Sequence, residues 1–327
     1  MTPETPQTKI KLDLKDKKLL TALDEDARYT NTQLAKKVGL SKPAVEYRLQ
    51  RFEKNNIILS HYALIDITRL GYSQYKIYFK FQNTSPEEEQ KITDYWVKNK
   101  NSVWVGQIRS RWDLAVSLLA KSNYEFGKEL DKFMSKFYNF ILEKDVLLTE
   151  YSPIYSREYL EKTQKKEFIY GIPSKTYNLD EADDKILKEL SNNARISIID
   201  LAEKTKLTRD IVSYRIKKLT NEGIIKQYKT YLNLQNLSIN HYKVIIRTKN
   251  FNESAERKIK DYVTTHKKAT QFLKLIGSWD IEIEFETEDE DELYKILTDL
   301  RKEFSEIIRD YDILRITKTF KLNFYPF

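Results

Sequence analysis

The hydrophobic pattern of the chain changes its period partway along, and the change occurs twice. In the first part, apolar residues such as Leu19, Leu20 and Leu23 recur at the three-to-four-residue spacing of an amphipathic helix. From Tyr75 to Phe81 the side chains instead alternate between apolar and polar, as in a half-buried strand. The pattern therefore predicts a helical unit followed by a mixed unit of strands and helices.

The same succession returns 167 residues later without a gap. Leu12-Asp13 falls on Leu179-Asp180, and Trp112-Asp113 falls on Trp279-Asp280. Agreement in one register over such a length indicates duplication of a unit of about 140 residues rather than a short-period solenoid. We call the two units copy one and copy two, and we expect the chain to be a covalent pseudo-dimer.

Each copy opens with three short predicted helices. The second is expected over Thr32 to Val38 and over Ile198 to Thr205, and a tight turn precedes the third. Short polar residues stand where helix N-caps are needed: Asp13, Thr30, Asp180 and Ser197. Asn56 and Gly223 follow the third helix, where a left-handed residue is wanted. These proportions are typical of a helix-turn-helix.

The third helix of each copy has two different faces. Its apolar positions form the predicted core: Val45, Leu49, Phe52, Val212, Ile216 and Leu219. The opposite face of copy two is basic and hydroxylated, with Ser213, Tyr214 and Lys217. Such a face is ordinarily just solvated. The preceding turn and the duplication favour a second interpretation, in which lysines and arginines neutralise phosphates while Ser and Tyr reach base edges.

The second half of each copy predicts the order βαββαβ of a ferredoxin-like sandwich, with tight hairpins at Ser110-Arg111 and Gly277-Ser278. The strand from Trp279 to Glu286 has apolar residues on one face and acids on the other. Helices would cover one face of each sheet, and Tyr and Ile beside Lys on the other face indicate that a partner covers it. Two short β-rich runs, Ile57 to Ile65 and Ile224 to Leu234, suit either a wing or a connecting strand.

Composition narrows the classes of function. The 57 Lys and Arg against 49 Asp and Glu leave a net charge of +8, consistent with a polyanionic partner. The absence of cysteine excludes disulfides and thiol nucleophiles, and the three histidines lack the spacing of a zinc site. We therefore expect no metal and no cofactor. Without a leader-like or long apolar segment, we expect a cytoplasmic protein with no membrane partner.

These patterns together predict an α+β chain of two tandem units, each a winged-type helix-turn-helix followed by a ferredoxin-like domain. The expected boundaries are an N-terminal arm at 1–11, a first DNA-binding domain at 12–61, a first ferredoxin-like domain at 62–151, a linker at 152–178, a second DNA-binding domain at 179–228, and a second ferredoxin-like domain at 229–327.

At this point the residues resemble a known family. The resemblance rests on four features: Leu-Asp at the start of the first helix, Ala-Arg after it, a third helix with Val and Arg ending near Gly223-Ile224-Ile225, and Gly277-Ser278-Trp279-Asp280 in the second hairpin. Together they are similar to the Lrp/AsnC (feast/famine) transcription regulators. The resemblance implies sequence-specific regulation, pairing through the ferredoxin-like sheets and an amino-acid-like effector between them. Such proteins usually carry one unit per chain. Copy one has Ser110 where the family has glycine, and a side chain there could block the effector.

The candidate DNA-binding residues lie on and before the two third helices: Ser41, Lys42, Glu46, Tyr47, Arg48, Gln50, Arg51, Thr208, Arg209, Ser213, Tyr214, Arg215, Lys217 and Lys218. For Arg48 and Arg215, an ion pair with a carboxylate of the first helix is as reasonable as a phosphate contact. The resemblance places candidate effector contacts at the hairpins: Gly277, Ser278, Asp280, Ser110 and Asp113.

Corresponding exposed positions of the two third helices differ: Glu46 stands against Ser213 and Gln50 against Lys217. The leading hypothesis is therefore a regulator that binds an asymmetric operator, with further homo-oligomerisation through the sheets. One alternative is an enzyme similar to the siroheme decarboxylases, which share this arrangement. Acid-base work would call for paired histidines or arginines, and no histidine recurs at equivalent positions. The other alternative is an architectural protein that bridges DNA.

Overall fold

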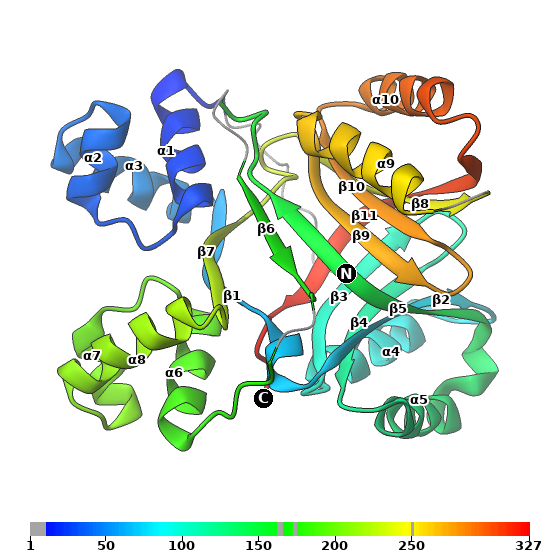
Figure 1. Cartoon of the computed structure of the whole chain (residues 1–327), viewed down its shortest axis with the longest axis horizontal. Helices are drawn as coiled ribbons and strands as arrows, with labels where there is room; N and C mark the ends of the chain where they lie inside the picture. Colours follow the sequence, from blue (N-terminus) through cyan, green and yellow to red (C-terminus); the bar gives the residue numbers. More distant parts are fainter. Residues whose placement is uncertain (1–10, 162–165, 173–174, 250–251) are drawn as a thin grey trace.

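The computed structural model describes residues 11–161, 166–172, 175–249 and 252–327; most of the expected N-terminal arm lies outside these ranges. Figure 1 shows the two helical units at one end of the molecule and the strands, with their covering helices, at the other. A narrow two-stranded ribbon lies between the two helical units. No helix in the described part of the chain is long and apolar enough to cross a membrane.

Each helical unit is a helix-turn-helix with three helices, as predicted. Copy one has α1 (Leu14–Glu25), α2 (Asn31–Val38) and α3 (Lys42–Lys54), and copy two has α6 (Glu181–Asn192), α7 (Ile198–Thr205) and α8 (Arg209–Asn221). The four predicted N-caps are confirmed, because each side chain accepts a hydrogen bond from the backbone N–H three residues on. The left-handed residues are confirmed too, with φ of 50° at Asn56 and 71° at Gly223.

The strand after each third helix pairs with its counterpart from the other copy. Strands β1 (Ile58–Ile65) and β7 (Ile225–Leu232) form an antiparallel two-stranded sheet in which Tyr62 faces Lys229. Of the two possibilities left open by the sequence, these segments are connecting strands. We call this pair the ribbon; it joins the two helical units directly.

The second half of each copy has the predicted order βαββαβ. Copy one comprises β2 (Ser73–Phe81), α4 (Pro86–Lys98), β3 (Ser102–Arg109), β4 (Leu114–Ala120), α5 (Asn123–Phe137) and β5 (Ile141–Tyr155). Copy two comprises β8 (Asn240–Thr248), α9 (Glu253–Thr265), β9 (Ala269–Ile276), β10 (Ile281–Thr287), α10 (Glu290–Glu303) and β11 (Ile308–Leu322). The strand orders are β5-β2-β4-β3 and β11-β8-β10-β9.

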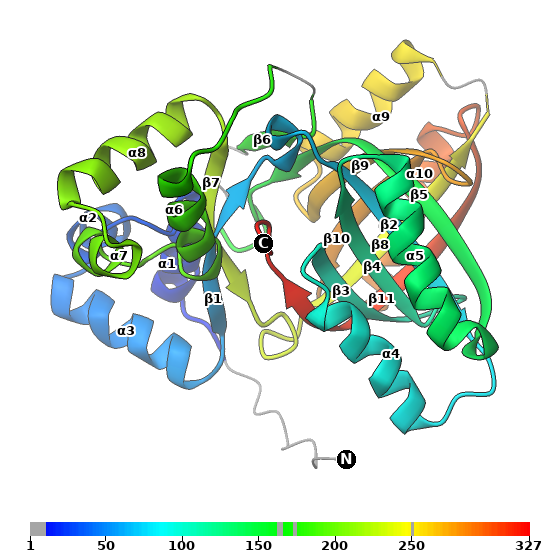
Figure 2. The ribbon, with the colours of Figure 1, turned by 90° about the horizontal axis from the view of Figure 1, so that it is seen from below.

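The two sheets join edge to edge at both ends. Strand β3 pairs with β11 and β5 pairs with β9, both antiparallel, so eight strands close into one ring. The helices of both copies cover the outside of this ring (Figures 1 and 2). The sheet face that needed a partner is therefore covered by the other copy. Inside the ring, apolar side chains of both copies form one cluster that includes Tyr78, Trp112, Leu273 and Trp279.

The segments that follow the last strand of each copy pack back onto the helical units. After β5, Leu160 is buried in the core of the copy-one helices. After β11, Tyr325 joins the core of the copy-two helices and its hydroxyl donates to Asp184 at 2.5 Å. Within the expected linker, β6 (Glu167–Tyr170) adds to the outer edge of β5. The ring and the helical units are thus connected by packed segments.

Candidate nucleic-acid interface

The two third helices lie on the outside of the helical pair. Figure 2 shows α3 and α8 on opposite sides, with α1 and α6 between them. Tyr47 and Tyr214 occupy equivalent positions on these helices and are 67% and 65% exposed. Large aromatic side chains held in solvent on a helix are unusual for a structural role and are available to a partner. The core positions predicted for both helices pack into the cores of their own units.

Six of the predicted DNA-binding side chains are exposed and have neither an ion pair nor a hydrogen bond to any described residue: Tyr47, Gln50, Arg209, Ser213, Tyr214 and Lys217. Four of them belong to copy two and include two cations. Copy one contributes no unpaired cation to this set, since Lys42 forms an ion pair with Glu46 at 3.7 Å. The exposed faces of the two helices therefore differ in charge as well as in shape.

Ser41 and Thr208 serve as helix caps. The Ser41 hydroxyl accepts from the backbone N–H of Ala44 at 3.3 Å, and the Thr208 hydroxyl accepts from that of Ile211 at 3.3 Å. Both residues are exposed at the start of their helices, where backbone N–H groups favour an anion such as a phosphate. Their capping role and a phosphate contact are compatible.

Arg48 and Arg215 are held by the first helix of their own unit. Arg48 pairs with Asp13 at 2.8 Å and with Asp16 at 2.5 Å. Arg215 makes the equivalent pairs, with Asp183 at 3.1 Å and with the helix-capping aspartate before it. The hydrogen bond from Arg48 keeps the pKa of Asp13 below its ordinary value. The geometry favours the structural interpretation of both arginines over a phosphate contact.

Two further candidates are partly engaged. Arg51 pairs with the buried Asp16 at 2.5 Å. The ammonium of Lys218 lies 5.4 Å from the centre of the Tyr177 ring, and the neighbouring tyrosine hydroxyl raises the pKa of this lysine. Both side chains are less free to follow a phosphate backbone than Lys217.

A reciprocal pair of arginines connects the two helical units. The Arg28 guanidinium donates to the carbonyl of Ala194 at 2.6 Å, and Arg195 donates to the carbonyl of Ala27 at 2.6 Å. Arg195 donates in addition to Asn31 Oδ1 at 3.1 Å. Because each arginine reaches across to the other unit, the two recognition helices are held at a fixed separation. The sequence repeat identified both Ala-Arg pairs, but no local pattern shows that each arginine binds the other copy.

The hairpin residues predicted to contact an effector are engaged within the fold. Asp113 accepts from the backbone N–H of Phe81 at 2.8 Å, and Asp280 accepts from that of Thr248 at 2.7 Å. Gly277 has a φ of 150°, and a Cβ added there would lie 2.6 Å from a methyl of Leu147. Glycine is thus needed for the close packing of copy two's hairpin on β5 of copy one.

The hairpin hydroxyls have similar local partners. Ser278 donates to Asp145 of β5, which ties copy two's hairpin to copy one. Ser110, at the equivalent position in copy one, accepts from the backbone N–H of Trp112 at 3.4 Å and is exposed. Effector binding at these hairpins remains a prediction.

The interior of the ring contains a charged cluster that the sequence did not predict. Glu282, at 0% exposure, accepts from Lys76 at 2.5 Å, from Lys243 at 2.8 Å and from the Tyr78 hydroxyl at 2.6 Å. Burial acts to raise the pKa of Glu282, but the two lysines outweigh it and the pKa is lowered. Burial lowers the pKa of Lys76 to about 8, while Lys243, which also pairs with Glu284, has a raised pKa.

A second buried ion network joins the ring to the copy-one helices. Arg157 pairs with Glu286 of β10 at 2.8 Å and with Asp24 of α1 at 2.7 Å. Lys229 of the ribbon lies 3.4 Å from the same aspartate, and Tyr159 donates to Glu286. We call Asp24, Glu282, Glu284 and Glu286 the inner carboxylates. The alternating acids from Trp279 to Glu286 are the sequence signal that could have indicated these buried networks. Burial of the acids, however, depends on contacts with the other copy.

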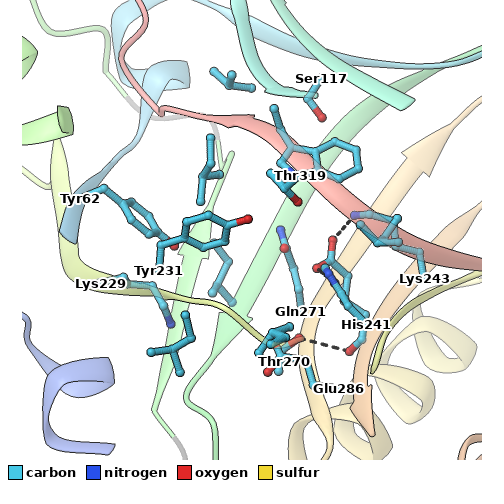
Figure 3. A pocket seen from close by; sticks show the side chains of 18 of the residues that line it. Tyr62, Ser117, Lys229, Tyr231, His241, Lys243, Thr270, Gln271, Glu286 and Thr319 are labelled. Atoms are coloured by element: carbon cyan, nitrogen blue, oxygen red, sulfur yellow. Dashed lines mark hydrogen bonds and ion pairs between the residues drawn. The ribbon is translucent and has the colours of Figure 1, made fainter. Parts of the chain in front are cut away.

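Glu284 and Glu286 line a cavity of about 380 Å³ between the ring and the ribbon, which we call the axial pocket. Asp24 and Glu282 do not line it, but they pair with Lys229 and Lys76, which do. Figure 3 shows Tyr62, Lys229 and Tyr231 of the ribbon on one side and Gln271, His241 and Lys243 of the ring on the other. Among the described residues, no group of three or more His, Asp or Glu could hold a metal ion. The polar lining suits an organic ligand better than a metal.

Comparison with known proteins agrees with this architecture. A model of the winged helix-turn-helix DNA-binding domain matches residues 12–58 and again residues 179–226. An uncharacterised HTH-type transcriptional regulator of Pyrococcus horikoshii is 29% identical over 126 residues, which is 38% of this chain and 84% of that protein. The leucine-responsive regulatory protein of Rhizobium meliloti is 38% identical over 64 residues, which is 20% of this chain and 41% of that protein.

The two matched segments define a protein with two winged helix-turn-helix DNA-binding units in one chain. The resemblance to the Lrp/AsnC type of transcriptional regulator is confirmed, in a tandem form with both units fused. The chain also aligns with the crystal structure of the siroheme decarboxylase NirDL, with a TM-score of 0.62 over 95% of this chain and 93% of that one, at 12% identity. At that identity the likeness shows a shared fold alone.

Proposed function

We propose that this protein is a sequence-specific transcriptional regulator whose two recognition helices bind two different half-sites of one operator. The observation that carries the proposal is the difference between the exposed faces of α3 and α8. Gln50 and Lys217 stand at equivalent positions, as do Glu46 and Ser213, and different side chains at base-facing positions select different bases.

The reciprocal arginines support a fixed geometry for this recognition. A pair of recognition helices on one rigid body is expected to place its half-sites one DNA turn apart, about 34 to 36 Å, or a multiple of that spacing. The two tyrosines, Tyr47 and Tyr214, are the exposed residues that the two faces share. We expect both of them to contact the DNA, with Lys217 and Arg209 neutralising phosphates in one half-site only.

A face-grafting experiment tests the proposal. The double variant Glu46→Ser/Gln50→Lys gives copy one two of the exposed residues of copy two. We expect it to shift the preferred DNA in a selection experiment from two unlike half-sites towards an inverted repeat of the copy-two half-site. The control, Glu87→Ser/Gln90→Lys, makes the same substitutions on exposed positions of α4, away from the helical units. An unchanged preference in the grafted variant would contradict the proposal.

The enzyme alternative rests on the fold shared with NirDL. Of the three histidines, only His241 lines the axial pocket, and its Nε2 lies 2.9 Å from Glu284. An absorbance titration with an iron tetrapyrrole distinguishes the alternatives, since a shifted spectrum at one equivalent would favour the enzyme. For the architectural alternative, equal affinity for selected and random DNA would be decisive.

An amino-acid-like effector at the hairpins is a further proposal that comes from the resemblance. The Asp113 and Asp280 carboxylates already accept backbone hydrogen bonds, so any ligand there would have to use their remaining lone pairs. Titration of single amino acids against the protein, with Asp280→Asn as the altered variant, tests this site. An unchanged affinity in that variant would remove the hairpin from consideration.

A further inference from the structure

The axial pocket lies where the two copies meet, and equivalent positions of both copies line it. Lys76 and Lys243 are related by the 167-residue shift, as are Trp104 and Gln271, and all four line the cavity. A cavity lined by both members of such pairs lies on the approximate twofold axis that relates copy one to copy two. In a homodimer its halves would be identical, whereas here they differ, so the cavity can favour one orientation of a ligand.

The inner carboxylates leave little acceptor capacity for a ligand. Glu282 accepts from two lysines and a tyrosine, and Glu286 accepts two hydrogen bonds from Arg157, at 2.8 and 3.0 Å, besides the one from Tyr159. Glu284 is engaged by His241 and Lys243. A ligand ammonium group would therefore compete with several established donors.

The donors of the pocket, in contrast, have capacity to spare. An ammonium group has three N–H donors, yet Lys76 has one carboxylate partner and Lys229 has one, Asp24 at 3.4 Å. The hydroxyls of Tyr62 and Ser117 have no hydrogen-bond partner among the described residues. Burial lowers the pKa of both lysines, so an additional negative group beside them would favour their charged forms.

The charges of the pocket limit the ligand to one negative charge. The cations that line it are Lys76, Arg157, Lys229, Lys243 and Lys318. Glu284 and Glu286 line the pocket with them. Asp24 and Glu282 lie outside the lining but pair with four of these cations, so five cations against four carboxylates leave an excess of one positive charge. The remaining lining includes aromatic surfaces, among them Trp104, Tyr155 and Phe324, against which an apolar or aromatic body can pack. A cavity of about 380 Å³ is within the range that encloses small ligands.

We propose that the axial pocket binds one small organic monocarboxylate per chain, such as a 2-oxo or 2-hydroxy acid without an ammonium group. Its carboxylate accepts hydrogen bonds from Lys229 and Tyr62 on the ribbon, and the rest of the molecule extends towards Lys76 and Ser117 on the ring. The ligand thereby connects the ring to the ribbon that separates the two helical units.

The ligand should affect the copy-one helical unit more than the copy-two unit. Lys229 contacts Asp24 of α1, and the side chain of Gln227 on the same strand donates to the backbone carbonyl of Asp24 at 2.9 Å. The equivalent of Asp24 in copy two is Ser191, which has no charge. If the proposed DNA-binding function is correct, the ligand should therefore change affinity for the copy-one half-site more than for the copy-two half-site. Binding itself does not depend on that function.

Calorimetric titration of the full chain tests the proposal. The probes are phenylpyruvate and 2-oxoisovalerate, with phenylalanine and valine as their amino counterparts. We expect at least one oxo acid to bind with a stoichiometry of one, and its amino counterpart to bind at least tenfold more weakly. Absence of binding by both oxo acids at millimolar concentration would overturn the proposal. Equal or tighter binding of the amino acids would overturn the choice of ligand class.

Two variants locate the site. Lys229→Met should raise the dissociation constant about tenfold to a hundredfold, because it removes a charge-assisted hydrogen bond. Ser117→Leu fills the cavity without removing an ion pair, so it should abolish binding even if Lys229→Met folds poorly. Lys217→Met on α8 is the control and should bind normally. Normal binding by folded Ser117→Leu would exclude this pocket. The calorimetric titration contains no DNA, so a failure of ligand binding is distinguished from a failure of the proposed DNA binding.

Discussion

Copy one and copy two share a backbone plan but not the chemistry of the face that each turns inward. On β10, copy two carries Glu282, Glu284 and Glu286, where copy one carries Ala115, Ser117 and Leu119. Both copies keep the lysine that points at these positions, Lys76 or Lys243. Two units of copy-one type would bury two lysines without acids, and two units of copy-two type would bury six carboxylates against two lysines. The inward faces of the two copies are therefore complementary in charge, and neither face would balance a second face of its own type.

The same comparison applies to the DNA-binding faces. Where the copies contact each other through backbone carbonyls, they remain alike, as Arg28 and Arg195 show. At several positions that face solvent or the axial pocket they have diverged, as Gln50 with Lys217 and Ser117 with Glu284 show. The duplication has thus kept the symmetric geometry of a dimer while it allows each half to recognise a different partner group.

The largest expected effect comes from breaking the charged pairing inside the ring. Glu282→Ala leaves Lys76 and Lys243 buried without their shared acid, and removal of one partner from a buried ion pair costs about 3–5 kcal/mol. Urea denaturation should show that loss. The control is Ser117→Ala, which alters the position equivalent to Glu284 and removes no charge; it should cost less than about 1 kcal/mol. A Glu282→Ala protein within 1 kcal/mol of the unaltered chain would show that the ring does not depend on this pairing.

Substitution of the two reciprocal arginines should lower the stability of the protein by different amounts. Arg195→Ala should destabilise the protein by about 3 kcal/mol and Arg28→Ala by about 2, because each removes charge-assisted hydrogen bonds and only Arg195 also reaches Asn31. The counterpart of Asn31 in copy two is Ile198, which offers no acceptor. In an Asn31→Ala background the two losses should become equal. A difference that persists there would assign the asymmetry to another contact.

A pH effect between about 6.5 and 4 is expected from a histidine that copy one has and copy two lacks. Burial, with Arg195 nearby, lowers the pKa of His61 to about 4 from an ordinary value of 6.5, and its equivalent in copy two is Tyr228. Between these values the unfolded state binds the proton and the folded state does not. Stability should therefore be complete above about pH 6.5 and fall by about 3 kcal/mol as the pH is lowered to about 4. His61→Gln should flatten this part of the stability profile; an unchanged slope would assign it to other groups.

The smallest expected effect separates the two DNA-binding faces. Lys217→Ala should weaken DNA binding about fivefold and reduce the salt dependence by about one unit, as expected for one lost phosphate contact. Gln50→Ala, at the equivalent position of copy one, should leave the salt dependence unchanged. Binding isotherms over a series of salt concentrations measure both. Equal salt slopes for the two variants would remove Lys217 from the phosphate contacts.

The sequence predicted the elements whose signals are local. Caps such as Asp13 and Ser197 and the left-handed Asn56 depend on neighbouring residues, and the structure confirms them. The strand predicted over Tyr75 to Phe81 is confirmed too, but not its half-buried character, because Tyr75 to Phe79 are buried on both faces of the sheet. Tyr and Ile beside Lys on the uncovered face also indicated that each sheet needed a partner.

The features that the sequence did not predict depend on contacts between copies. An acid such as Glu282 in a period-two strand has the pattern of a solvent-exposed face, and only closure of the ring buries it. Arg28 and Arg195 stood out as repeated residues, but their partners lie more than 160 positions away along the chain. The axial pocket likewise exists only once the ribbon and the ring have been assembled.

Selection of bound duplexes from a random DNA pool tests the central claim most directly. The unaltered full-length chain is incubated with the pool, and the bound sequences are determined after several rounds. The account predicts two unlike half-sites at one fixed separation, close to one helical turn of DNA or a multiple of it. A perfect palindrome would contradict the divergence of the two recognition faces, and a pool without enriched sequence would contradict sequence-specific regulation altogether.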